Sequence, residues 1–353
     1  MPNNEFSSLI AYCRPGFESE CTQELAARAE KLEVGGYARS QRDSGLVEYV
    51  FADAVATNRF DREVAWRDLT FARQLLRVLA RVDDLPRQDR LAALLPSVRA
   101  SGKRYCDAWI EAPDSDAARE LASLCRSLNS ALITALKREH LLETDSPWRL
   151  HVCMADATTA YVAEADVERC APWPRGIPRL NFPTGAPSRS TLKLDEALLV
   201  LLNEAERARW LKPGMTAVDL GAAPGGWTFQ LVRRSIHVTA IDNGPMDTAL
   251  LDSGLVTHRR EDGFRYRPPM PVDWLVCDMV EKPRRVAALV GDWLASGACR
   301  MAMFNLKLPM KKRFDEVNLC QSVIVDAVAN SSHKQLDWRA RQLYHDREEI
   351  TVF

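Results

Sequence analysis

Long apolar segments are missing from this chain of 353 residues. No run reaches the roughly 20 apolar residues that a membrane-spanning helix requires. The first ten residues, MPNNEFSSLI, also lack the basic and apolar regions of a signal peptide. We therefore expect a cytoplasmic protein with no membrane partner.

Metal-binding cysteine patterns and a strong charge of one sign are missing as well. The nine cysteines are scattered, with no Cys-x-x-Cys pair and no neighbouring histidine to complete a metal site. We interpret them as reduced, mostly buried thiols and expect no metal. The net charge of -1 neither demands nor excludes a nucleic-acid partner, because the clustering of charges matters more than their sum.

The composition is that of an ordinary folded protein. Apolar residues make up 46% of the chain and charged residues 27%, which excludes collagen-like and largely disordered chains. The length predicts two or three domains, each large enough to bury its own core.

The first half of the sequence has the pattern of small α+β modules. Alternating apolar residues indicate strands, and a longer apolar period indicates helices between them. The predicted elements are strands at 8–14 and 46–51 around a helix at 18–32, then strand-like segments at 67–79 and 105–113, a helix at 116–140 and a hairpin at 148–165.

Residues 166–190 differ from both flanks because they contain five of the 19 prolines and four arginines. Proline removes backbone donors and keeps the chain extended, so this segment is predicted to connect two folding units. Its basic residues leave open a contact with a phosphate backbone.

After residue 190 strands and helices alternate, which predicts a doubly wound, mostly parallel α/β sheet. Ligands bind such sheets beyond the carboxyl ends of the strands. The predicted elements are helices at 192–210, from 227, near 284–295 and near 315–330, with strands at 216–220, 237–242, 273–278, 301–306 and 349–353.

The strongest local signal is the turn DLGAAPGGWT, from Asp219 to Thr228, directly after an apolar strand. Gly221 permits a tight turn, and Gly225 and Gly226 would let backbone amides approach a ligand where a Cβ would collide. Pro224 has no N–H to offer, and the turn lacks the P-loop and G-x-G-x-x-G patterns of phosphate and dinucleotide sites. The turn therefore suits a nucleoside ligand without phosphate.

Two acidic residues extend this candidate ligand site. Asp242 ends the next strand, where a carboxylate can accept hydrogen bonds from both ribose hydroxyls, and Asp262 is placed to meet an adenine edge. The set resembles the S-adenosylmethionine site of Rossmann-fold methyltransferases. The predicted cofactor-binding residues are Ser190, Asp219, Gly221, Ala222, Pro224, Gly225, Gly226, Trp227, Asp242, Asp262 and Asp278.

Four charged residues form the predicted catalytic set. Lys193 lies in the first turn of a helix, where the helix dipole disfavours a cation; Asp278 and Lys307 end strands, and Glu349 begins one. Methyl transfer to a sugar hydroxyl needs a base held in line with the methyl donor. We assign Lys307 as that base, with its pKa lowered by the neighbouring Lys193, and Asp278 and Glu349 as the acids that hold the lysines and the hydroxyl.

This K-D-K-E set with the glycine turn resembles the FtsJ/RrmJ-like RNA 2′-O-ribose methyltransferases. More closely, the segments YCRPGFE, SRSTLKLDEA, CDMVEKP, FNLKLPMKKR and LYHDREEITV resemble the RlmM family of large-subunit ribosomal RNA methyltransferases, over nearly the whole chain. The resemblance implies S-adenosylmethionine as cofactor and ribose methylation of a cytidine in the peptidyl transferase region of 23S ribosomal RNA. It also implies a ferredoxin-like domain at 1–54, a THUMP RNA-binding domain at 55–165, a linker at 166–190 and the methyltransferase domain at 191–353.

Several alternatives stay open at this stage. The fourth acid is Glu348 or Glu349, and we choose Glu349 because the apolar strand residues begin directly after it. Cys277 could serve a cytosine C5 methyltransferase, although no proline accompanies it and core packing is favoured. The absence of an N/D-P-P-aromatic turn disfavours N-methylation. A noncatalytic RNA-binding or ribosome-assembly factor is the other alternative.

Outside the catalytic set, other residues have less specific interpretations. His345 is interpreted as a surface residue, and Trp66, Phe71 and Trp109 as core. Two groups have equal claims to RNA contact and to plain solvent exposure: Arg67, Arg73 and Arg77, and Lys311, Lys312 and Arg313. No self-complementary interface is evident, so a monomer is expected.

Overall fold

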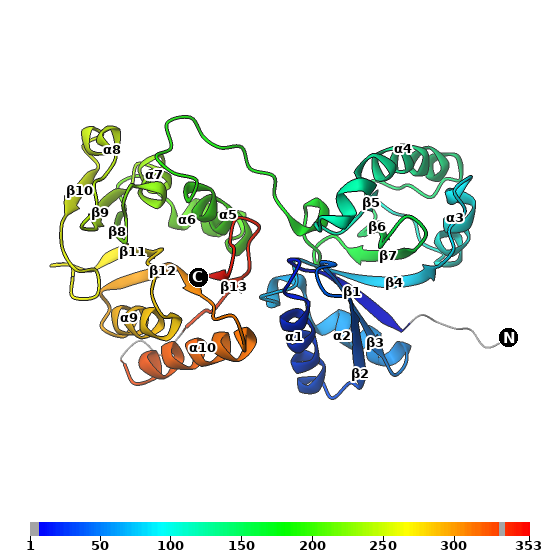
Figure 1. The fold of residues 1–353 in the computed structure, drawn as a ribbon, viewed down its shortest axis with the longest axis horizontal. Coiled ribbons are helices and arrows are strands. Elements are labelled where there is room, and N and C mark those ends of the chain that lie inside the picture. Colours follow the sequence, from blue (N-terminus) through cyan, green and yellow to red (C-terminus); the bar gives the residue numbers. More distant parts are fainter. Residues whose placement is uncertain (1–6, 332–335) are drawn as a thin grey trace. The chain divides into compact units, whose positions relative to one another are not determined.

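The computed structural model describes residues 7–331 and 336–353. The chain divides into two compact units, Met1–Pro178 and Arg179–Phe353. Each unit is built on one seven-stranded sheet (Figure 1). Among the described residues, no helix is both long and apolar enough to cross a membrane.

The first unit has one continuous sheet in the order β2-β3-β1-β4-β7-β6-β5. All neighbours in it are antiparallel except β5 and β6, which are parallel. The strands are β1 (Ser8–Tyr12), β2 (Gly36–Ser40), β3 (Leu46–Phe51), β4 (Gln74–Val82), β5 (Asp107–Glu111), β6 (Trp148–Met154) and β7 (Ala160–Asp166), and the helices are α1 (Glu18–Lys31), α2 (Ala54–Glu63), α3 (Arg90–Ala100) and α4 (Ala122–Arg138). The hairpin expected at 148–165 is confirmed as β6 and β7.

Strand β4 joins the two modules that the sequence predicts for this unit. It pairs with β1 on one side and with β7 on the other, so both modules share one hydrogen-bonded sheet. Two apolar clusters cover it: one centred on α3, α4 and β5, the other including Ile10, Leu76 and Tyr161. The boundaries at 54, 165 and 190 stay predictions.

The segment 166–190 is anchored at both of its ends. Near its start, Ala171 is buried and its N–H donates to Gln74 Oε1 at 2.9 Å. Near its end, Ser188 and Ser190 pack against the glycine turn of the second unit. A short 3-10 turn, η3 (Pro174–Gly176), interrupts its extended backbone.

The second unit confirms the doubly wound α/β prediction. Its sheet has the order β10-β9-β8-β11-β12-β14-β13, with helices on both faces (Figure 1). The strands are β8 (Thr216–Leu220), β9 (His237–Ile241), β10 (Val256–Arg259), β11 (Val272–Cys277), β12 (Cys299–Lys307), β13 (Ala340–Arg341) and β14 (Glu349–Val352), and the helices are α5 (Thr191–Leu201), α6 (Glu204–Trp210), α7 (Gly226–Val232), α8 (Thr248–Asp252), α9 (Pro283–Ala295) and α10 (Arg313–Ala329).

The sheet is mostly parallel, as predicted: β8 to β12 are mutually parallel, and the terminal strand β14 is antiparallel to β12. One detail differs from the prediction. The single helix expected at 192–210 is two helices, because Asn203 caps a new one. Its Oδ1 accepts from Glu206 N at 2.9 Å, and Glu206 Oε2 accepts from Asn203 N at 2.8 Å, which forms a capping box.

Candidate active site

The parallel register brings the carboxyl ends of three strands to one edge of the sheet. Leu220 pairs with Cys277, and Cys277 with Phe304. The glycine turn after β8 and Asp278 after β11 therefore lie at the same edge, and β12 runs three residues further to Lys307. The antiparallel strand β14 then places Glu349 directly opposite Lys307.

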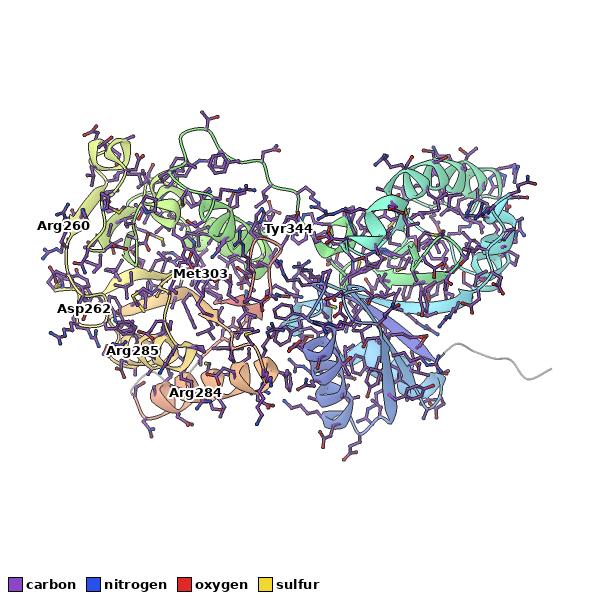
Figure 2. All side chains as sticks on the ribbon, viewed as in Figure 1. Arg260, Asp262, Arg284, Arg285, Met303 and Tyr344 are labelled. Carbon is purple, nitrogen blue, oxygen red and sulfur yellow. The ribbon has the colours of Figure 1, made fainter. Side chains whose placement is uncertain are left out.

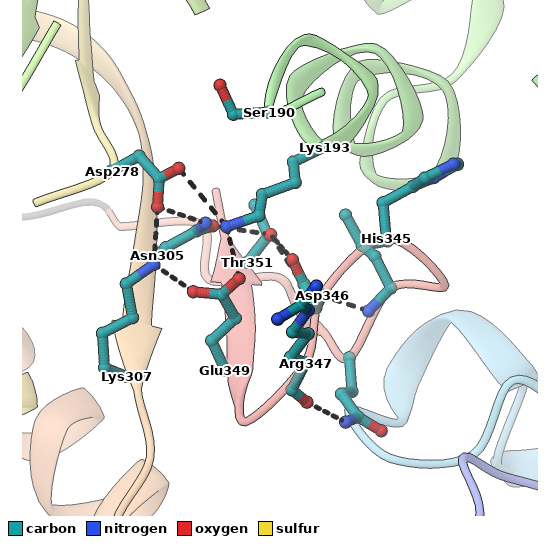
Figure 3. Close-up of polar contacts among 12 residues, drawn as sticks. Ser190, Lys193, Asp278, Asn305, Lys307, His345, Asp346, Arg347, Glu349 and Thr351 are labelled. Carbon is teal, nitrogen blue, oxygen red and sulfur yellow. Dashed lines mark hydrogen bonds and ion pairs between the residues drawn. The ribbon is translucent and has the colours of Figure 1, made fainter. Parts of the chain in front are cut away.

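The four predicted catalytic residues form one ion-pair cluster (Figure 3). Lys307 Nζ lies 2.6 Å from Asp278 Oδ1 and also pairs with Glu349. Lys193 Nζ lies 3.3 Å from Asp278 Oδ2 and pairs with the other oxygen of Glu349. Each carboxylate thus bridges both lysines, with all four side chains at most 23% exposed. The two positive and two negative charges cancel, which offsets the desolvation free energy lost when the cluster is buried.

A buried polar layer holds the carboxylates of the cluster. Asn305 Nδ2 donates to Asp278 Oδ1 at 2.9 Å, and Asn305 Oδ1 lies 2.7 Å from Thr351 Oγ1. Thr351 also contacts Asp346 at 3.1 Å. Burial, with nearby Glu349 as a second cause, raises the pKa of Asp346 well above its usual value. The layer fixes the carboxylate of Asp278 toward both lysines.

The electrostatics of Lys307 differ from the expectation that its pKa is lowered. Burial does lower the pKa of Lys307, but attraction to Asp278 and Glu349 outweighs burial, so that its pKa lies above the usual value. The sequence argument considered the second cation, Lys193, and underestimated two carboxylates that contact the amine directly. Lys307 is a stable ammonium in this arrangement.

Glu348 and Glu349 face different surroundings. Glu349 is buried and faces both lysines. Glu348 points the other way, is 64% exposed and pairs with Arg313. Successive residues of a strand face opposite sides of the sheet, so only one of the two acids can reach the cluster.

The glycine turn lies next to the cluster and packs against it at two points. A Cβ on Gly221 would come 2.7 Å from Met279 Cγ, directly after Asp278. A Cβ on Gly226 would collide with Ser190 Oγ, one helical turn before Lys193. A Cβ on Gly225 would meet Leu250. Gly225 and Gly226 therefore make room for protein atoms and tie the turn to its neighbours, while the expected approach of their amides to a ligand stays a prediction.

The carboxylates around the turn have distinct surroundings. Asp219 is buried and accepts from Thr228 Oγ1 at 2.6 Å; burial raises its pKa to about 7. Asp242 accepts from Ala223 N at 3.1 Å and Gly244 N at 2.7 Å, so it is fixed at the end of β9. No basic residue lies in the turn 219–228. These carboxylate acceptors fit a ligand with hydroxyl groups and a positive charge, rather than a phosphate.

The other predicted cofactor residues lie around the same turn. Ala222 and Trp227 are buried, and within the described residues Trp227 Nε1 has no hydrogen-bond partner. Ser190 Oγ lies 2.7 Å from Ser188 Oγ, and Pro224 is exposed. Asp262 lies in the loop after β10 (Figure 2), where its Oδ1 accepts from Phe264 N at 2.9 Å.

Cys277, the alternative nucleophile, lies in the core, and His345, the expected surface residue, contacts a buried carboxylate. Cys277 is fully buried, and burial raises the pKa of its thiol to about 12, which is unfavourable for a nucleophile. The surface interpretation of His345 is wrong: its Nδ1 lies 2.6 Å from Glu196, a buried carboxylate that also accepts from the backbone N–H groups of Tyr344 and His345. This contact holds the segment that leads into β14.

The three arginines with equal claims to RNA contact and to plain exposure, Arg67, Arg73 and Arg77, do not share an environment. Arg73 is buried, and Arg77 lies 3.9 Å from the buried Glu164. Only Arg67 is exposed, next to the Trp66 ring. The spacing therefore reflects packing rather than one solvent-facing surface.

The three aromatic residues predicted as core divide in two groups. Trp66 and Phe71 are buried, as expected. Trp109 is only half-buried; Arg149 stacks on it at 3.9 Å, and it lines a cavity of about 590 Å³ with Arg119 and Arg126.

Sequence reasoning missed the residues that support the catalytic cluster from behind. Asn305 sits inside the strand MAMFNL, and Thr351 alternates with apolar residues in β14. A fully buried asparagine in an apolar strand is a signal that could have found the layer, because such a group needs a partner. Asp346 and Glu196 carried no such signal, since their burial depends on a long-range contact.

Comparison with known proteins agrees with this fold. Residues 186–337 match an FtsJ-like methyltransferase model, which together with the doubly wound sheet defines a Rossmann-like methyltransferase. Residues 6–76 match the RlmM ferredoxin-like domain, and residues 89–165 match the N-terminal region of ribosomal RNA large subunit methyltransferase M.

Three relatives that match 98% of the chain carry the same description. Ribosomal RNA large subunit methyltransferase M from Xanthomonas oryzae pv. oryzae, Xanthomonas axonopodis pv. citri and Xanthomonas campestris pv. campestris is 51% identical over 350 residues, 98% of this chain and of each relative. The chain belongs to the family of the ribosomal RNA large subunit methyltransferases M. It is thus an S-adenosylmethionine-dependent methyltransferase with ribosomal RNA as its substrate class.

Several solved structures align over nearly the full length at low similarity. TrmN from Thermus thermophilus is 17% identical over 98% of both chains, with a TM-score of 0.36. This likeness is too low to add to the argument.

Proposed function

We propose that this chain methylates the ribose 2′-hydroxyl of a cytidine in the peptidyl transferase region of 23S ribosomal RNA, with Lys307 as the general base. The observation that carries the proposal is the cluster of two lysines bridged by Asp278 and Glu349 beside the glycine turn. The buried, high-pKa thiol of Cys277 supports ribose over cytosine C5 as the target.

The cofactor would lie along the carboxyl edge of the sheet. Asp242 and Asp262 offer carboxylate oxygens to its hydroxyl and amino groups, and the turn 219–228 would form its wall. Bound there, S-adenosylmethionine supplies an electrophilic methyl group on a positively charged sulfur.

The chain's own residues then have three tasks. Asp278 and Glu349 fix the two amines in place, which orients a hydroxyl without help from solvent. Lys193 contacts the target hydroxyl as a hydrogen-bond donor. The neutral amine of Lys307 accepts the hydroxyl proton as the oxygen attacks, and the amine thereby becomes an ammonium.

The raised pKa of Lys307 sets a condition on this step. Only the neutral amine accepts a proton, so Lys307 must lose one before each turnover. A positive charge next to the Lys307 amine, such as that on the cofactor's sulfur, lowers its pKa. Movement of Asp278 or Glu349 away from the amine has the same effect. Loss of the proton from Lys307 is therefore coupled to the binding of cofactor and substrate.

The first unit would deliver the RNA. We extend the proposal to the predicted ferredoxin-like and THUMP domains at 1–54 and 55–165, the linker at 166–190 and the catalytic domain at 191–353. A monomer in the cytoplasm, acting on 23S RNA or its precursor particle without a metal, completes the proposal.

The test is nucleoside mass spectrometry of ribosomal RNA from cells with and without the protein. The expected result is one ribose-methylated cytidine that is lost without the gene and restored by the wild-type chain. A methyl group on the base, or a covalent adduct with fluorinated cytosine, would instead identify a C5 methyltransferase. Restoration by a double Lys193→Ala, Lys307→Ala variant would identify a noncatalytic factor.

A further inference from the structure

The two loops that follow β11 and β12, next to Asp278 and Lys307, each expose one large apolar side chain. Val280 and Met310 are both 90% exposed, and no other large apolar residue in the described part of the chain exceeds 77%. Water contact with this much apolar surface is unfavourable, and such residues commonly mark binding sites when they cluster.

Contacts on both sides hold these loops together. At the sheet edge, Lys307 Nζ lies 2.6 Å from Asp278 Oδ1. At the start of the following helices, Arg284 on α9 (Figure 2) forms a bidentate pair with Glu316 on α10, with N–O distances of 2.8 to 3.1 Å. In sequence, Val280 and Met310 each lie between the two bridged residues of their own segment, and the strands that lead into these segments, β11 and β12, are paired in parallel.

Backbone and packing contacts also fix each loop. Met279, directly before Val280, packs against Gly221 of the cofactor turn. Leu308 N donates to the Glu348 carbonyl at 2.7 Å, two residues before Met310. Fixed loops present their side chains at a low cost in conformational entropy.

The surroundings of the apolar pair are basic. Lys311 and Lys312 follow Met310 directly and are exposed, and among the described residues neither has an ion pair. Apolar side chains flanked by free cations match a nucleotide, which has an apolar base face and an anionic phosphate. A protein partner of matching chemistry would need an acidic rim around an apolar centre.

We propose that Val280 and Met310 contact the base of the nucleotide that enters the active site, while Lys311 and Lys312 contact its phosphates. The inference rests on the proposed function and identifies the part of the RNA that the site binds. Ribosomal RNA is read by proteins mainly where bases are unstacked, and an extruded base needs a new apolar surface. The soft thioether of Met310 suits contact with an aromatic ring.

The test compares the double variant Val280→Ser, Met310→Ser with the wild type in methyl transfer to protein-free ribosomal RNA from cells that lack the gene. We expect kcat/KM to fall roughly tenfold or more, as for loss of a base contact, with cofactor affinity and melting temperature unchanged. Val280→Ile, Met310→Leu should restore the activity. Met270→Ser, at a 73% exposed methionine outside these loops, is the matched control.

Salt dependence separates the apolar contact from the phosphate contacts. Lys311→Gln, Lys312→Gln should weaken RNA binding and reduce its salt slope, whereas the serine variant should weaken binding without changing the slope. Serine-variant activity within twofold of the wild type would overturn the inference and point to a protein partner. Failure of the wild type to methylate ribose would overturn the proposed function instead.

Discussion

Lys103 in the first unit and Lys307 in the second form ion pairs of the same length but in different settings. Each amine lies 2.6 Å from a carboxylate oxygen, and the two side chains are 27% and 23% exposed. Lys103 shares the single carboxylate of Glu164 with Arg77 and lies 3.3 Å from the centre of the Trp148 ring. Lys307 lies between two carboxylates at the end of a strand.

The comparison shows that a short, half-buried ion pair does not identify an active site by itself. Glu164 lies within an antiparallel pairing of β7, surrounded by donors that neutralise it. The Lys307 pair lies where parallel strands end beside a glycine turn, the edge at which α/β sheets bind ligands. Position in the sheet, rather than the pair itself, separates Lys307, the proposed catalytic lysine, from Lys103.

The largest expected effect comes from removing Lys307, and the same change at Lys103 is its comparison. Lys307→Ala should lower kcat by roughly 10²- to 10⁴-fold, the usual contribution of a general base, and leave cofactor binding near normal. Lys103→Ala should keep kcat within about twofold because its amine lies outside the cluster. Steady-state methyl transfer measures kcat, and calorimetric titration measures cofactor binding. Equal loss of kcat in the two variants would break the comparison.

The next effect concerns pH and the carboxylates around Lys307. Its pKa is raised, and only the neutral amine accepts a proton, so kcat/KM should rise with pH throughout the range where the enzyme is stable. Glu349→Gln removes one stabilising charge, so the rising limb should move to lower pH while kcat falls, by roughly tenfold. Glu348→Gln, at the exposed neighbour, should leave the profile unchanged. An unmoved limb in Glu349→Gln would exclude Lys307 as the titrating base.

A smaller effect, on stability alone, is expected at the structural pair. Lys103→Met removes one of the cations that neutralise the buried Glu164, with Arg77 left at 3.9 Å. We expect the free energy of unfolding to fall by about 1–3 kcal/mol, with kcat unchanged. Urea denaturation measures the first quantity and methyl transfer the second. A matched loss of kcat would show that this pair also serves the reaction.

The smallest effect is expected at the hydroxyl beside the same carboxylate. Tyr105 Oη donates to Glu164 Oε2 at 3.2 Å, so Tyr105→Phe should cost about 1 kcal/mol of stability. In Tyr105→Phe, Lys103 still neutralises Glu164. The double variant with Lys103→Met should therefore lose more stability than the sum of the two single losses. Strict additivity in urea denaturation would mean that the two donors act independently.

Local sequence patterns predicted the parts of the site that depend on short segments. The strand, turn and helix around Asp219 follow from an apolar run and a glycine pair, and the positions of Asp278 and Lys307 follow from where apolar strands end. Glu349 was chosen over its neighbour from the same reasoning, and the structure brings it to the lysines.

The features that sequence patterns missed depend on long-range contacts. The antiparallel direction of β14 depends on its pairing with β12 on one side and β13 on the other, not on its own residues. Glu24 accepts from the backbone N–H of Phe71 at 2.9 Å, a contact across 47 residues that no local pattern reveals. The raised pKa of Lys307 likewise depends on two acids from distant segments.

The pairing of β4 with both β1 and β7 has a consequence for dissecting the molecule. A fragment that begins at residue 55 would leave one side of β4 with unpaired backbone groups along Gln74 to Arg77, where β1 now binds. Exposed strand edges of this kind recruit other chains and promote aggregation. Fragments meant for RNA-binding experiments should therefore retain the amino-terminal strand β1.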